Sequence, residues 1–144
     1  WFEDVLAGMH RAGQQNTPGP DAAATAISEA LGRAPLALDL LGHLGAGLEH
    51  NASAETVRGF KLFLLAHSRS LGRSLAALLP GLDETGQPRL CMRVFALILG
   101  YRQVAHPTPV AAKVMAETPE LAPFRLDLHD ELRAALRAAF VEYA

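Results

Sequence analysis

The longest helical pattern in the chain is SAETVRGFKLFLLAHSRSLGRSLAALLPG, residues 53–81, and it sets the class of the fold. Ser53 suits an N-cap, and Glu55 places an acid in the first turn, where the helix dipole favours negative charge. Apolar residues then recur at helical spacing as far as Leu79, and Pro80 and Gly81 end the pattern. These residues predict one long helix of about 26 residues.

The rest of the chain repeats helical spacing between breaks rich in glycine and proline. Further helices are predicted over residues 1–12, 21–31, 36–49, 88–105, 110–116 and 127–143. No segment alternates with period two between hairpin turns, so we expect no β-sheet. The helix over residues 88–105 is apolar on nearly every side, and we expect it to be buried on two faces. The sequence predicts an all-α bundle of about six helices plus a short helix.

Composition places the chain among globular proteins and sets aside several classes. Half of the 144 residues are hydrophobic, 19% are charged, and the length suits a single domain over residues 1–144. The formal charge of -2 gives no basic field for nucleic acid. Cys91 is the one cysteine, which excludes an intrachain disulfide and favours the cytoplasm, and no apolar run is long enough for a membrane helix.

Catalytic and metal-binding patterns receive little support. Gly72-Arg73-Ser74-Leu75-Ala76 approaches a nucleophile elbow, but its final glycine is missing and it lies in the middle of a helix. The six histidines do not form a pair at metal-ligand spacing, and no cofactor fingerprint is complete. We therefore expect no enzyme activity, metal or cofactor. Cys91, Asn51 and Ser74 are expected to play no part in ligand binding.

Polar residues stand within the two most apolar helices. His67 shares a face of the long helix with Phe60 and Phe63, and Arg102 shares a face of residues 88–105 with Phe95 and Ile98. Such faces suit an apolar pocket with a few polar anchors, but a plain core has the same periodicity. Both interpretations are compatible with the pattern.

The order of the predicted helices resembles the regulatory core of TetR-family (TetR/AcrR-like) transcriptional regulators, and so do AETPELAPFR at residues 116–125 and DELRAAL at residues 130–136. The resemblance covers essentially the whole chain. It implies a bacterial, cytoplasmic repressor in which a small molecule controls DNA binding by an N-terminal helix-turn-helix domain. This chain lacks that domain and, with no capping residue before Trp1, is expected to begin inside the linking helix.

We expect an apolar or aromatic effector to bind between the helices predicted over residues 36–49, 53–79 and 88–105. The predicted lining is Leu40, His43, Leu44, Phe60, Phe63, Leu64, His67, Phe95, Ile98, Leu99 and Arg102. His67 and Arg102 would supply the polar anchors, and Arg102 suits a carboxylate.

A homodimer is expected from the apolar residues left over on the helices over residues 88–105 and 127–143. Two such helices from each subunit would make a four-helix bundle, which the resemblance also implies. The expected interface is Leu90, Leu97, Tyr101, Val104, Leu132, Leu136, Phe140 and Tyr143. The alternatives are a stand-alone α-helical module for protein interaction and, with less support, a helical-bundle enzyme.

Overall fold

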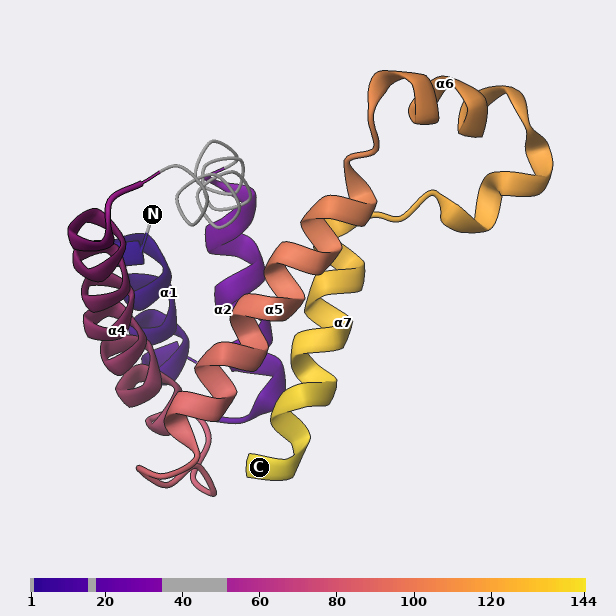
Figure 1. The fold of residues 1–144 in the computed structure, drawn as a ribbon. Helices are drawn as coiled ribbons and strands as arrows, with labels where there is room; N and C mark the ends of the chain where they lie inside the picture. The colour runs from indigo at the N-terminus through magenta and orange to yellow at the C-terminus, as the bar shows by residue number, and fades with distance from the viewer. Residues whose placement is uncertain (1, 16–17, 35–51) are drawn as a thin grey trace.

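A computed structural model describes residues 2–15, 18–34 and 52–144, and these residues form helices and connecting turns without a strand (Figure 1). The α-helices are α1 (Phe2–Gln15), α2 (Pro20–Gly32), α4 (Ala54–Ala76), α5 (Gln87–Ala105), α6 (Pro109–Glu117) and α7 (Leu128–Phe140). Two 3-10 helices are η1 (Pro119–Phe124) and η2 (Val141–Tyr143). The all-α prediction is confirmed, whereas the helix expected over residues 36–49 lies outside the described residues.

The helix ends follow local chemistry, with two departures from expectation. The Ser53 side chain caps α4 by accepting a bond from the Thr56 amide at 3.2 Å, as predicted. However, α4 ends at Ala76, because Leu78 and Leu79 turn into the core and are fully buried. The second departure is α1, which ends at Gln15 rather than at residue 12. Asp21 lies in the first turn of α2 and accepts a bond from Arg137 Nε of α7 at 2.6 Å.

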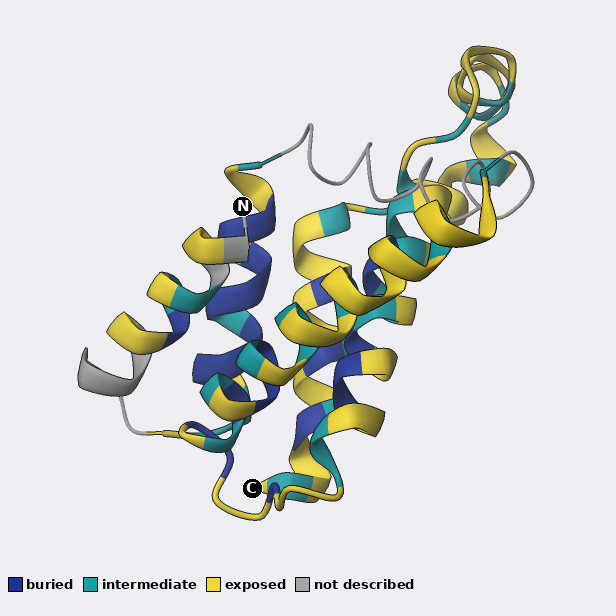
Figure 2. Ribbon diagram, turned by 60° about the vertical axis from the view of Figure 1, so that its left-hand side comes forward, coloured by how far each residue is buried: buried dark blue, intermediate teal, exposed yellow. Residues whose placement is uncertain are grey.

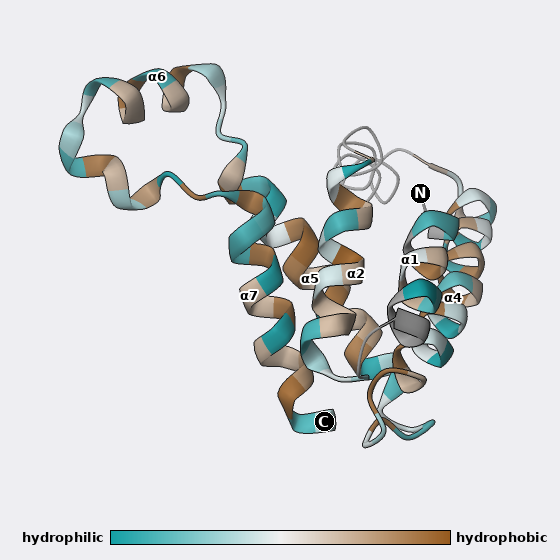
Figure 3. Cartoon of the chain, turned by 180° about the vertical axis from the view of Figure 1, so that it is seen from behind, coloured by the Kyte–Doolittle hydropathy of each residue, from teal (hydrophilic) through white to brown (hydrophobic). Residues whose placement is uncertain are grey.

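Five helices form a closed ring around the core, in the order α1, α2, α7, α5 and α4, with α4 returning to α1. α2 lies between α1 and α7 and contributes five buried alanines, whose small side chains let both neighbours approach closely. Buried residues line the inward sides of these helices (Figure 2), and so do the apolar ones (Figure 3). The larger core side chains on these helices are Met9, Ile27, Leu31, Leu71, Leu75, Leu90, Val94, Ile98, Leu132, Leu136 and Phe140, and the turn after α4 adds Leu78, Leu79 and Leu82.

The expectation that residues 88–105 are buried on two faces is wrong. The buried residues of α5 are Leu90, Cys91, Val94 and Ile98, which occupy one side of the helix. Met92 and Val104 are exposed on the outward side. α2 is instead the helix buried around most of its circumference.

The carboxyl terminus is fastened to the turn between α4 and α5. The Gly81 amide donates to the Tyr143 carbonyl at 3.0 Å, and Arg93 of α5 pairs with Glu142. This ion pair lowers the pKa of the Glu142 carboxyl below its ordinary value. In the same turn Asp83 accepts a bond from the Gly86 amide at 2.7 Å, which together with Thr85 lowers the pKa of Asp83. The turn and the chain end are therefore held together by these bonds.

Two glycines of α4 should respond in opposite directions to the same substitution. Gly59 has no atom within 4 Å of an added Cβ, so Gly59→Ala should raise the free energy of unfolding by roughly 1 kcal/mol through helix propensity. A Cβ at Gly72 would lie 2.9 Å from Gln87 Oε1 and 3.0 Å from Gln87 Cβ. Gly72→Ala should lower the free energy of unfolding by about 1–3 kcal/mol, measured by urea denaturation.

The double variant Gly72→Ala/Gln87→Gly serves as the control, because it removes the Gln87 atoms that meet the new Cβ. Relative to Gln87→Gly alone, Gly72→Ala should then lose its penalty. Equal stabilisation by alanine at both glycines would contradict the close packing of α4 on the start of α5.

Candidate effector-binding cavity

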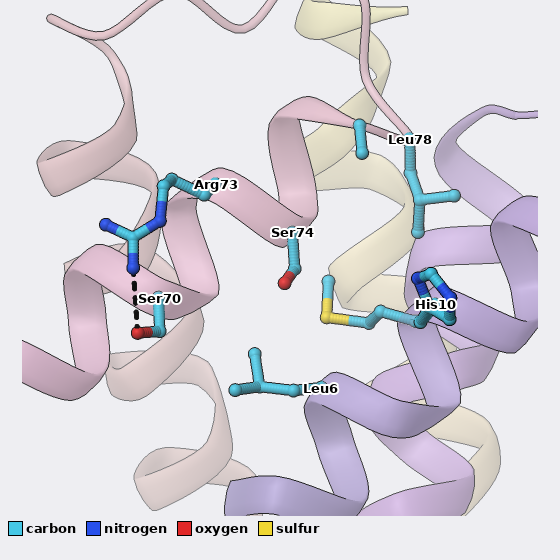
Figure 4. A pocket seen from close by; sticks show the side chains of 8 residues that line it. Leu6, His10, Ser70, Arg73, Ser74 and Leu78 are labelled. Atoms are coloured by element: carbon cyan, nitrogen blue, oxygen red, sulfur yellow. Dashed lines mark hydrogen bonds between the residues drawn. The ribbon is translucent and has the colours of Figure 1, made fainter.

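An open cavity of about 600 Å³ lies between α1 and α4 (Figure 4). Its volume falls within the range usual for small-molecule sites. It is lined by Leu6, Met9 and His10 of α1, by Ser70, Arg73 and Ser74 of α4, and by Ala77 and Leu78 of the following turn. Met9 and Leu78 are almost fully buried, whereas His10 and Arg73 are exposed. The cavity thus combines an apolar floor with a polar rim.

The polar rim is organised along one side of α4. Arg73 Nη2 donates to Ser70 Oγ at 3.1 Å, and Ser70 Oγ donates to the Ala66 carbonyl at 3.5 Å. Figure 4 shows the Ser74 hydroxyl directed into the space between the helices, with Leu6 facing it from α1. A guanidinium carries five N–H donors, so Arg73 can hold Ser70 and still meet an acceptor on a ligand. The arrangement suits an amphipathic molecule with one acceptor group.

The position of this cavity follows from the ring of helices. α1 packs closely on α2 but meets α4 over a shorter length, and α1–α4 is the sparsest of the five contacts that close the ring. The sequence did not predict this cavity, because it placed the effector pocket between residues 36–49, 53–79 and 88–105 and assigned Ser74 no part in ligand binding. The available signal was the i, i+3 pair Leu6 and Met9 on the apolar edge of α1.

The residues predicted to line an effector pocket differ in burial. Leu40, His43 and Leu44 lie outside the described residues. Ile98 belongs to the protomer core, and Phe63 is 56% exposed. The half-buried members are Phe60, Leu64, His67, Phe95, Leu99 and Arg102. α4 and α5 carry these residues, and the two helices diverge toward the amino-terminal end of α4 and the carboxyl-terminal end of α5 in Figure 1.

His67 is engaged with its own helix. Its Nδ1 lies 2.8 Å from the Phe63 carbonyl oxygen, and its ring lies 4.0 Å from the Phe63 ring, measured between centroids. This local contact accounts for a polar residue in an apolar helix, because a half-buried polar group needs a partner.

Half of the predicted dimer interface requires correction. Leu90, Leu132, Leu136 and Phe140 are buried within the protomer, so they have no surface to offer a second subunit. The reason is that α7 has a single apolar stripe, and this stripe packs on α2 and α5 of its own chain. Leu97, Tyr101 and Tyr143 are half-buried against the core, and Val104 is 53% exposed.

Groups for covalent or metal chemistry are sparse in the described part of the chain. Cys91 is buried, and its thiol donates to the Ser68 carbonyl at 3.2 Å. Burial raises the pKa of this thiol to about 11. Among the described residues no group of three His, Cys, Asp or Glu side chains could hold a metal ion, and no helix has the length and hydropathy to cross a membrane.

A known protein family matches nearly the whole chain. The family model described as tetracyclin repressor-like, C-terminal domain matches residues 1–140. The chain belongs to this TetR-like family. Domains of this kind belong to transcriptional regulators rather than enzymes, and they typically dimerise and bind small-molecule effectors. No curated protein matches the chain significantly.

Cys91 of this TetR-like domain should be inert to thiol reagents in the folded state. With a pKa of about 11, only about one thiol in a thousand is ionised at pH 8, and burial also blocks access. Reaction with a disulfide reagent such as DTNB should be at least roughly 100-fold slower than in urea-unfolded protein, where an ordinary cysteine pKa applies. Comparable rates in the two states would contradict the buried position.

Proposed function

We propose that this chain is the effector-sensing and dimerisation domain of a TetR-family repressor in the bacterial cytoplasm. The observation that carries the proposal is the family match over residues 1–140 in a helical ring with a cavity at its α1–α4 seam. The net charge of -2 gives this domain no general attraction for DNA. This supports DNA binding by a separate helix-turn-helix domain that precedes α1 in the parent repressor. Control of DNA binding is then allosteric, without turnover.

The cavity suggests how an effector acts on α1. A ligand that contacts Leu6 and Met9 on one wall and Ser74 on the other bridges the sparsest contact of the ring. Such a ligand favours the arrangement of α1 that completes its contacts, and it shifts the equilibrium by its difference in affinity for the two arrangements. In a parent repressor, movement of α1 would change the spacing of the two DNA-binding heads.

The chemistry of the walls favours an amphipathic effector. Leu6, Met9 and Leu78 offer apolar contact, and Arg73 with Ser70 offers hydrogen-bond donors at the rim. The half-buried residues on α4 and α5 that the sequence predicts as ligand contacts remain the second proposed location, with Phe95 and Leu99 as its apolar members.

We also propose a two-fold homodimer formed by the outward sides of α5 and α7. The exposed residues there are Val104 on α5 with Ala134 and Ala138 on α7, and Leu97 and Tyr101 of α5 keep part of their surface exposed. Small residues on α7 allow helices of two subunits to approach closely. Leu136 has no place in this interface, and charge at that position would disrupt the protomer core instead.

Effector binding is tested by a thermal-shift screen of the domain against small apolar and amphipathic compounds, followed by titration of each hit. Ser74→Leu fills the proposed site, so it should weaken binding at least tenfold. Ala66→Leu adds the same side chain at an exposed position of α4 that does not line the cavity, so it should leave binding unchanged.

Two results would distinguish a wrong location of the binding site from a wrong function. Loss of affinity in Leu99→Ser with none in Ser74→Leu would move the effector to the α4–α5 faces. A screen in which no compound raises the melting temperature or binds on titration would count against effector sensing as a whole.

The homodimer predicts a particle mass in solution of twice the 15.4 kDa of one chain. Light scattering coupled to size-exclusion chromatography at micromolar concentration measures it directly. A mass equal to that of one chain would overturn the homodimer.

A further inference from the structure

The segment from Thr108 to Arg125, here called the arm, contains α6 and η1 and projects away from the helical ring (Figures 1 and 3). Neither α6 nor η1 has a buried residue. Large apolar side chains on the arm face solvent instead, with Val110 76% exposed and Phe124 62% exposed. The arm is therefore well formed but not covered by its own protomer.

Local hydrogen bonds define the shape of the arm. Thr108 caps α6 by accepting a bond from the Ala111 amide at 3.4 Å. Arg125 closes the base, because its Nε donates to the Met115 carbonyl at 3.0 Å and its Nη2 donates to the Ala116 carbonyl at 3.3 Å. The closed base surrounds a hollow of about 230 Å³ with a largely apolar lining.

These local hydrogen bonds are not enough to stabilise the arm without a packing partner. α6 has nine residues, and isolated helices shorter than about 12–15 residues are marginal in water. Most helical stability in proteins comes from packing an apolar face, but α6 packs mainly on η1, and neither element has a buried residue. A packing partner from outside the protomer would cover the exposed apolar side chains of the arm.

We infer that the arm packs against a second copy of this chain, and this inference rests on the proposed homodimer. The arm joins α5 to α7, so it leaves the ring at the end of the two helices that would face the partner. Those helices give Leu90, Leu132 and other apolar residues to their own core. Stable interfaces bury about 1,200–2,000 Å² in total, and the exposed Val110 and Phe124 of the arm add apolar surface to that of the two helices.

The charge of the arm agrees with a protein partner. The charged residues of the arm are Lys113, Glu117, Glu120 and Arg125, whose formal charges cancel, and Lys113 lies 3.8 Å from Glu117 in an i, i+4 pair. A segment with so little positive charge offers no electrostatic attraction to nucleic acid or to an anionic membrane. Two-fold symmetry gives both subunits the same contact, so in one dimer each arm packs on the other subunit.

The test compares two double variants of the same arm. Val110→Ser/Phe124→Ser removes exposed apolar side chains, whereas Lys113→Ser/Glu117→Ser removes exposed charged ones. Sedimentation equilibrium should show at least tenfold weaker dimerisation for the apolar variant and less than a threefold change for the charged one. All four positions are exposed in the protomer, so circular dichroism of both variants should match the wild type.

Hydrogen exchange on the unaltered domain gives a second readout that does not depend on variant folding. Amides of residues 110–117 should be protected where the dimer predominates and lose protection on dilution below its dissociation constant.

A wild-type dimer whose arm amides exchange at the same rate at both concentrations would overturn the inference and leave the homodimer standing. Equal dimerisation of the apolar and charged variants would do the same. A monomeric wild type would overturn both proposals.

Discussion

Close packing around the alanines of α2 is the constraint on which the rest of the structure depends. Ala23, Ala24 and Ala30 have no measurable exposure, and they bring α1 and α7 onto opposite sides of one thin helix. The distance between packed helices depends on the side chains at the contact, so larger residues here would separate both neighbours. With α1 and α7 fixed by α2, the ring can close through α5 and α4.

The same arrangement explains why the cavity lies where it does. α1 is held firmly by α2, and α4 is held by α5 and by the buried turn that contains Leu78, Leu79 and Leu82. Among the described residues, the contact between α1 and α4 is the sparsest of the five that close the ring. A sparse seam between two well-anchored helices is a suitable place for a ligand to act, because filling it changes their separation without breaking the core.

Membership of the TetR-like family favours a sensor over the other functions that the composition permits. A helical-bundle enzyme would need a nucleophile with its base or a metal site. Domains of this family belong to regulators rather than enzymes, and Cys91 is buried with a raised pKa. The alternative of an interaction module shares one feature with the proposed function, because the arm inferred to contact a second subunit has no buried residue in α6 or η1.

The sequence by itself determined the class of the fold and most helix boundaries, because capping residues and breakers act locally. Ser53 before α4 and Pro107 after α5 can be understood without knowledge of the neighbours. It also led to the family through the order of helices and the tail at residues 116–136.

Tertiary structure decided which apolar faces meet. Leu132, Leu136 and Phe140 form a stripe that suits a dimer interface as well as a core, and only the position of α2 shows that the core uses it. Helical periodicity reports that a face is buried without naming what covers it. For the same reason the sequence could not place Ser74 on a cavity wall or show that the arm leaves the ring, since both depend on the distances between helices.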